Sequence, residues 1–269
     1  MGIIGISVLA RAQRHYIPGQ IWHITHRCHK REFLLKFSKD RRRWVQWLYE
    51  AKKRYGLMIL NYTVTSNHVH LLVVGDHKRE TIPNSIKLIA GRTGQEFNQR
   101  KNRKGAFWED RYHATAVENG EHLIKCIVYI DLNMLRAGVV KHPSEWPFCG
   151  YNEIQEPKRK TVLINYHKLT TLLGFNSYAE VIKYHKRWVE SHLENGNNIR
   201  DDIWTQSIAV GNENFIEKIK SLMGAMAIGR ISTEAGDSYQ LREPPATYIA
   251  HFGAKKSDIG PGNSYFWND

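Results

Sequence analysis

Apolar and polar residues alternate along several short stretches in the first half of the chain. This alternation predicts strands over 21–27, 57–65 and 68–75, since successive side chains of a strand point to opposite faces. The short turn Ser66-Asn67 joins the last two strands and predicts a hairpin. A fourth strand is expected over 107–117.

Between these strands the apolar residues recur at helical spacing. Helices are predicted over 38–55, 84–102 and 120–138, the first of them capped by Ser38 and stopped by Gly56. The order of elements is therefore β-α-β-β-α-β followed by α. It predicts an α+β fold of the ferredoxin-like split βαβ type, with an antiparallel sheet and its helices on one face. The other face of the sheet would be left free for a ligand.

Beyond Pro143 the pattern changes. Residues 143–165 are rich in loop-forming residues, a helix is predicted over 178–193, and Asn212 is expected to cap another. After Gly224, glycine, proline and polar residues predominate, which predicts a poorly ordered tail or a surface wrap. The predicted organisation is a ferredoxin-like domain over 1–142, a helical C-terminal extension over 143–224 and a loop-rich tail over 225–269.

The net charge indicates the class of partner. The 269 residues contain 39 Lys and Arg against 26 Asp and Glu, a formal charge of +13, which favours a polyanion and most often nucleic acid. The alternative is that the excess only aids solubility. Clustering of the charges favours the first interpretation, and the clusters are 41–43 and the group Arg100, Lys101, Arg103 and Lys104.

The three cysteines, Cys28, Cys126 and Cys149, lie far apart and support neither a disulfide framework nor a zinc knuckle. That usage suits a reducing cytoplasm. The first ten residues are apolar but lack a basic start and are too short to span a bilayer. The sequence therefore predicts a soluble cytoplasmic protein with no membrane partner and no organic cofactor.

Two histidines separated by one residue, His68-Val69-His70, begin the third predicted strand. Both imidazoles project from the same face of that strand, and two imidazoles on a rigid sheet make half of a metal site. The alternative is that they are ordinary core or edge histidines, which is common for so short a motif.

The helix predicted over 120–138 is apolar except for one narrow stripe. On a helical wheel this stripe contains His122, Lys125, Tyr129, Asn133 and Arg136. It could be a plain water-facing side of an amphipathic helix. Tyr129 and Asn133 are one turn apart, however, so both can point at a shared centre.

These groups together suggest a reaction. Two imidazole nitrogens from His68 and His70 and the amide oxygen of Asn133 would give three protein ligands with open positions, which suits Mg²⁺ or Mn²⁺ at a phosphoester. The phenol of Tyr129 could then attack phosphorus and form a covalent phosphotyrosine. A free phenol has a pKa near 10, so the metal and Lys125 would have to favour the phenolate.

Several ordered motifs resemble a known family. The segment Ser66-Asn67-His68-Val69-His70-Leu71-Leu72-Val73 resembles the HUH motif of single-tyrosine transposases. Other segments resemble the REP-associated tyrosine transposase branch, namely Pro18-Gly19, Trp108-Glu109-Asp110-Arg111-Tyr112, Tyr129-Ile130-Asp131-Leu132-Asn133, Arg136-Ala137-Gly138-Val139-Val140 and Trp146. The resemblance covers roughly residues 11–150, and 166–224 looks like an extension of longer members.

The resemblance implies a DNA transposase with a ferredoxin-like fold that cleaves and rejoins single-stranded DNA at imperfect hairpins. It implies His68, His70 and Asn133 as ligands of a divalent Mg or Mn ion. It implies Tyr129 as the catalytic nucleophile, leaving a 5′-phosphotyrosine and a free 3′-hydroxyl. The residues expected to contact DNA are Arg100, Lys101, Arg103, Lys104, Arg111, Lys125 and Arg136.

Alternatives remain open at this point. Tyr112 is a competing nucleophile, although it lies on a predicted strand and not beside a potential ligand. Members of the family usually have proline directly after the Asn, whereas Met134 follows here, and this is the support for a non-catalytic DNA-binding protein that kept the fold. A relaxase or replication initiator is a third hypothesis, weaker because those enzymes usually arrange histidines and tyrosine differently.

Overall fold

The structure, a computed structural model, describes residues 16–75, 78–196 and 201–244. The apolar first ten residues and the segment 245–269 lie outside the described residues. The strands are β1 (Ile21–Arg27), β2 (Met58–Val64), β3 (His68–Val74), β4 (His113–Val117), β5 (Ala209–Gly211), β6 (Ile231–Ala235) and β7 (Ser238–Arg242). The α-helices are α1 (Ser38–Tyr55), α2 (Thr81–Lys101), α3 (Glu121–Asp131), α4 (Asn133–Arg136), α5 (Gly150–Gln155), α6 (Tyr166–Leu172), α7 (Tyr178–Glu194), α8 (Ile203–Gln206) and α9 (Glu213–Met223).

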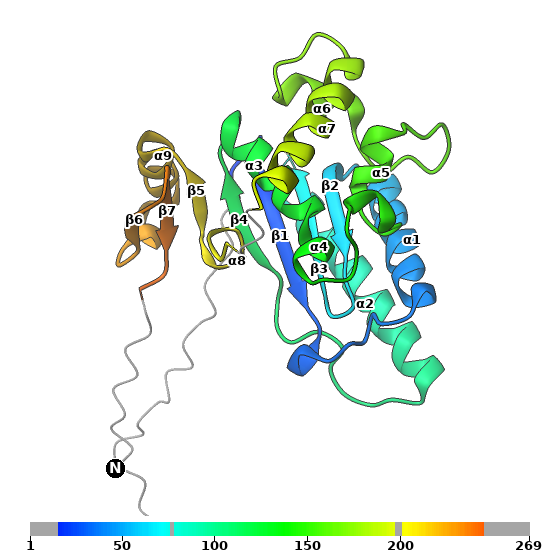
Figure 1. The fold of residues 1–269 in the computed structure, drawn as a ribbon. Coiled ribbons are helices and arrows are strands. Elements are labelled where there is room, and N and C mark those ends of the chain that lie inside the picture. The colour runs from blue at the N-terminus through cyan, green and yellow to red at the C-terminus, as the bar shows by residue number, and fades with distance from the viewer. Residues whose placement is uncertain (1–15, 76–77, 197–200, 245–269) are drawn as a thin grey trace, which may run out of the picture.

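One sheet runs through the described part of the chain, in the strand order β2-β3-β1-β4-β5-β7-β6 (Figure 1). Its pairs are antiparallel except β4 with β5, which is parallel. The predicted α+β class, the β2–β3 hairpin and the mostly antiparallel sheet are confirmed. In the register of the central strands, His70 lies opposite Thr25 of β1 and opposite Thr63 of β2.

Strand alternation sorts the side chains of β1 and β3 onto two faces. One face carries Ile24 and Leu71, which pack with Trp44 of α1 and Ile86 and Ile89 of α2. This is the apolar core that the periodicity of both helices predicts.

The other face carries polar side chains and is covered by α3. Oγ1 of Thr63 on β2 donates a hydrogen bond to the carbonyl of Ile130 on α3, at 3.0 Å. The expectation that the helices lie on one face and leave the other free is therefore wrong. After β4 the chain crosses to the polar face, because α3 is apolar on most of its circumference and needs a buried position.

The predicted helix 120–138 is present but interrupted. It is divided at Leu132 into α3 and α4, with Asn133 as the first residue of α4, and the turn ends at Gly138 in a left-handed conformation (φ 68°). The fourth strand is shorter than predicted, since β4 begins only at His113.

The C-terminal part adds strands as well as helices. β5 pairs with β4, and the hairpin β6–β7 continues the sheet outward beside α9 (Figure 1). A loop-rich tail was expected over 225–269, but the structure forms strands β6 and β7 within 231–242. Most of their side chains are exposed or half-buried at the sheet edge, and few are apolar. The alternation of apolar and polar residues was therefore too weak to predict them.

Within 16–75, 78–196 and 201–244 no helix has both the length and the apolar character needed to cross a bilayer.

Candidate active site

The two imidazoles of the H-x-H motif lie side by side on the polar face of the sheet. The ring centroids of His68 and His70 are 4.9 Å apart, with the rings nearly perpendicular at 78°. Both belong to β3, whose alternation puts positions 68 and 70 on the same face. The prediction that these side chains share a face is confirmed.

A cavity of about 800 Å³ opens at this place and brings the predicted site residues together. His68, His70, Tyr129 and Asn133 all line it. Its wall also includes Thr25, Arg27, Arg31, Glu109, Asp110, Arg111, His113, Arg136, Asp202, Thr205 and Gln206. The cavity therefore joins the sheet, the helix pair α3–α4 and α8 of the extension.

Hydrogen bonds determine which nitrogen of the His68 imidazole carries the proton and which keeps a lone pair. Nδ1 of His68 lies 2.8 Å from Oδ1 of Asn67 and 3.0 Å from Oγ1 of Thr65, whose hydroxyl hydrogen is donated to the carbonyl of His68. Nδ1 of His68 is therefore the donor, and Nε2 keeps a lone pair in the neutral ring. This is the orientation that metal-binding histidines usually have.

The side chains of His70 and Asn133 are in direct contact. The Nδ2 atom of Asn133 lies 2.9 Å from Nε2 of His70. Because a side-chain amide carries a donor and an acceptor at equivalent ends, the same side chain can offer its oxygen at this place.

These donors fit a divalent ion of the Mg²⁺ or Mn²⁺ class. Among the described residues no group of three His, Cys, Asp or Glu side chains could hold a metal. The cavity instead offers the two imidazoles of His68 and His70 and the amide of Asn133. Without thiolate, and with open positions for phosphate oxygens, this donor set suits a catalytic ion better than a structural zinc.

His23 is a site residue that sequence reasoning missed. Its ring plane lies within 11° of that of His70, with the centroids 5.1 Å apart, and Nε2 of His23 lies 2.9 Å from Nδ1 of His70. Burial lowers the pKa of His23 to about 3, so its imidazole is neutral. The signal was present in the alternation of β1, where 23 and 25 share the polar face.

Tyr129 lies among aromatic rings at the edge of the cavity. Its ring centroid is 5.8 Å from that of His70, 6.0 Å from His23 and 6.1 Å from Trp204. The guanidinium of Arg136 covers the ring at 4.3 Å and donates to the backbone carbonyl of Tyr129. Packing on several sides holds the phenol in one place and leaves only 7% of the residue exposed.

The competing tyrosine lies elsewhere. Tyr112 precedes β4 and lines a second cavity with Trp22 and Ile24, whose side chains point to the opposite face of the sheet. The two cavities share Asp110, Arg111 and His113. Tyr112 itself is absent from the residues around His68 and His70.

The predicted DNA-contacting residues fall into three places. Arg111 and Arg136 line the cavity. Arg100, Lys101, Arg103 and Lys104 lie at the end of α2, where Arg100 pairs with Asp40 and Arg103 lies 3.5 Å from Glu32. Lys125 pairs with Glu121 and with Asp237 in the β6–β7 turn and does not line the cavity.

Comparisons with known proteins concern the part of the chain that contains the predicted site residues. Residues 17–133 match the model of a protein family described as "Transposase IS200 like". No curated protein matches the chain. The segment 17–133 contains both imidazoles of the motif, Tyr129 and Asn133.

Two solved structures are similar to parts of the chain. One is described as a REP-associated tyrosine transposase bound to a REP hairpin, 21% identical, covering 54% of this chain and 84% of that chain with a TM-score of 0.46. The other is a putative transposase from Deinococcus radiodurans R1, 16% identical, covering 48% and 98% with a TM-score of 0.33. Residues 17–133, which are less than half of the chain, are thus similar to the IS200-like transposase family.

Proposed function

We propose that this protein is a metal-dependent transposase that cleaves and rejoins single-stranded DNA carrying a hairpin, through a covalent bond to Tyr129. The observation that carries the proposal is the convergence of Tyr129 and Asn133 with His68 and His70 around one cavity. The match of residues 17–133 to the IS200-like transposase family supports the reaction class. The hairpin and the single-stranded substrate rest on the resemblance to REP-associated tyrosine transposases.

The metal site would be built by His68, His70 and Asn133. A divalent ion held there would neutralise charge that develops on the scissile phosphate. His68 contributes an Nε2 lone pair because its Nδ1 proton is held by Asn67. Asn133 contributes from the opposite side, from the turn of helix that follows Tyr129.

Tyr129 acts as the nucleophile. Its phenol oxygen forms a bond to phosphorus while the bond from phosphorus to the 3′-oxygen breaks. The phenol proton is released, and the leaving 3′-oxygen takes up a proton, so the net proton count is unchanged. Attack by a 3′-hydroxyl reverses the step and rejoins DNA, since one phosphodiester is exchanged for another.

Cationic side chains in the cavity would hold the phosphate. Arg136 covers the Tyr129 ring, and Arg27, Arg31 and Arg111 line the same cavity. Guanidinium groups suit this task because their planar donors match phosphate oxygens.

A neighbouring surface would carry the strand that leads to the cavity. We define the basic aromatic surface as Lys30, Arg31, Phe33, Lys36, Phe37, Lys39, Arg100, Lys101, Arg103 and Lys104. The two phenylalanines are exposed, Phe33 at 65% and Phe37 at 51%, and Nζ of Lys101 lies 5.5 Å from the Phe37 ring. Arg31 belongs both to this surface and to the cavity. Exposed rings among cations suit unpaired bases on a phosphate backbone.

A covalent-adduct assay tests the proposal. The full-length protein is incubated with an end-labelled hairpin oligonucleotide and Mn²⁺, and the products are separated under denaturing conditions. We expect a labelled protein–DNA adduct that EDTA prevents. Tyr129→Phe should abolish it, because phenylalanine has no oxygen to attack phosphorus.

Tyr112→Phe is the matched control, since it removes the same hydroxyl from the other side of the sheet. Its adduct should equal that of the wild type. An adduct that survives Tyr129→Phe would show that another residue is the nucleophile. DNA binding without any adduct, whichever metal is supplied, would support the non-catalytic DNA-binding alternative.

A further inference from the structure

A continuous chain of hydrogen bonds runs from the C-terminal extension into the candidate metal site. The backbone carbonyl of Trp204 in α8 lies 2.9 Å from Nδ1 of His23, and Nε2 of His23 lies 2.9 Å from Nδ1 of His70. Nε2 of His70 in turn lies 2.9 Å from the amide of Asn133. His23 and His70 are buried, and their ring planes lie within 11° of parallel, an arrangement that suits a hydrogen bond between ring nitrogens.

The first link decides the direction of the others. A carbonyl oxygen can only accept, so Nδ1 of His23 must carry the proton. Nε2 of a neutral His23 then has a lone pair and accepts from Nδ1 of His70. His70 is left with its own lone pair on Nε2, the atom that faces Asn133.

We propose that His23 and the Trp204 carbonyl are positioning groups that hold His70 in the tautomer presenting Nε2 to a metal ion. The inference rests on the metal site of the proposed function. It assigns a role to the extension, because Trp204 lies beyond residues 17–133.

The Trp204 carbonyl is itself held in place. Oγ1 of Thr115 on β4 shares its one hydrogen between this carbonyl, at 3.3 Å, and the carbonyl of Ser207, at 2.6 Å. The Trp204 ring is buried and packs beside Tyr129. β5 continues from this segment and pairs with β4, so α8 is fixed against the strand next to His23.

The plain alternative is that His23 only fills space under the sheet. A space-filling residue would not determine where the His70 proton resides, and an apolar residue of similar size could replace it. Metal ligands, by contrast, depend on the partner of their second nitrogen, and loss of such a partner lowers metal affinity about 10- to 100-fold.

The test uses the full-length protein with ¹⁵N-labelled histidine and no DNA. Long-range ¹H–¹⁵N spectra report which nitrogen of each imidazole carries the proton, and Mn²⁺ affinity is measured separately by the loss of the free-ion EPR signal. In the wild type we expect His70 to be protonated on Nδ1. A His70 protonated on Nε2 would overturn the proposal without any variant.

Two variants extend the test. His23→Leu removes the acceptor, so we expect mixed His70 tautomers and Mn²⁺ affinity lowered about 10- to 100-fold. His23→Gln supplies an amide oxygen that can accept from Nδ1 of His70, and should restore most of the affinity. Wild-type affinity in His23→Leu, or no recovery in a folded His23→Gln, would overturn the proposal.

His122→Leu is the matched control. His122 is also a buried histidine, but it contacts Glu118 and Ser238 away from the cavity. Its replacement should leave Mn²⁺ affinity unchanged. These measurements need no cleavage, so a missing DNA adduct with the expected tautomer and affinities would count against the proposed function and not against the role of His23.

Discussion

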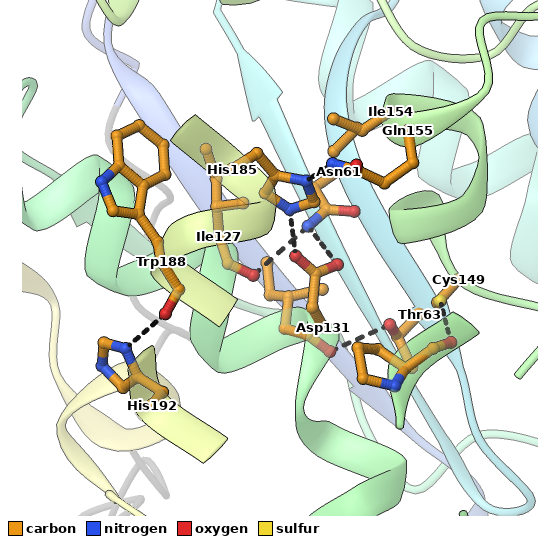
Figure 2. Close-up of polar contacts among 12 residues, drawn as sticks. Asn61, Thr63, Ile127, Asp131, Cys149, Ile154, Gln155, His185, Trp188 and His192 are labelled. Atoms are coloured by element: carbon orange, nitrogen blue, oxygen red, sulfur yellow. Dashed lines mark hydrogen bonds and ion pairs between the residues drawn. The ribbon is translucent and has the colours of Figure 1, made fainter. Parts of the chain in front are cut away.

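The Nε2 atom of His185 lies 2.7 Å from Oδ2 of Asp131, and both side chains are buried (Figure 2). Asp131 is the last residue of α3, midway between Tyr129 and Asn133, and His185 belongs to α7 of the extension. The other carboxylate oxygen accepts from Nδ2 of Asn61 on β2 at 2.9 Å. The helix that carries the candidate nucleophile is thus tied to the sheet and to the extension at one residue.

His185 is itself held by a further contact. Nε2 of Gln155 lies 2.7 Å from Nδ1 of His185 (Figure 2). The same amide nitrogen also donates to the carbonyl of Ile182. Since Nδ1 accepts from this amide, Nε2 of His185 donates to Asp131. The carboxylate is therefore satisfied by two donors in the interior.

We expect His185→Leu to destabilise the protein by about 3 kcal/mol, because it leaves a buried carboxylate with one of its donors missing. Urea unfolding followed by circular dichroism measures the change. His167→Leu is the control: His167 is exposed on α6, and its replacement should shift stability by less than about 0.5 kcal/mol. Equal stabilities of the two variants would show that the Asp131–His185 pair contributes nothing.

The periodicity of the sequence correctly predicted features that depend on one strand or one helix alone. Strand alternation placed His68 and His70 on one face, and helical spacing placed Tyr129 and Asn133 one turn apart; both relations hold in the structure. What failed depends on packing between distant segments. The polar stripe of the third helix was treated as one face, yet Lys125 pairs with Asp237, about which the sequence pattern contains no information.

The three thiols should be unreactive in the folded protein. Cys28, Cys126 and Cys149 are buried, and burial raises the pKa of Cys28 to about 12 and raises the pKa of the other two as well. Because the thiolate is the reactive form, iodoacetamide at a pH of about 8 should label the native protein negligibly, while an unfolded thiol has a pKa of about 8.5. Mass spectrometry should find three labels per chain in guanidinium chloride, which serves as the control. Rapid labelling of native Cys126 would contradict the packing of α3 against the sheet.

Asn133 should contribute to metal affinity through its amide. Asn133→Ala removes the group that lies 2.9 Å from Nε2 of His70, and we expect Mn²⁺ affinity to fall about tenfold or more, since even a supporting contact to a ligand is worth that much. The loss of the free Mn²⁺ EPR signal measures it. Lys125→Ala, about two helical turns before Asn133 and outside the cavity lining, should bind Mn²⁺ as the wild type does. A Mn²⁺ affinity that falls further in Lys125→Ala than in Asn133→Ala would place Lys125 in the metal site.

The exposed phenylalanines should contribute to binding of single-stranded DNA. Each base stacked on an aromatic ring is worth about 1–3 kcal/mol, so we expect Phe33→Ala and Phe37→Ala each to weaken binding of an unpaired oligonucleotide by about 5- to 150-fold. Fluorescence anisotropy without metal measures this affinity independently of cleavage.

Two comparisons test the role of the rings. One is with replacement of a charged side chain, and the other is with replacement of an exposed apolar side chain elsewhere. Lys36→Ala should weaken binding and also reduce its salt dependence, because a phosphate contact releases counterions, whereas Phe33→Ala should leave the salt dependence unchanged. Ile228→Ala is the matched control, since Ile228 is 82% exposed but lies outside the basic aromatic surface. If Phe33→Ala and Ile228→Ala bind the oligonucleotide equally well, the strand does not cross this surface, and its path to Tyr129 must be sought on the other side of the cavity, where Asp202, Thr205 and Gln206 form the wall.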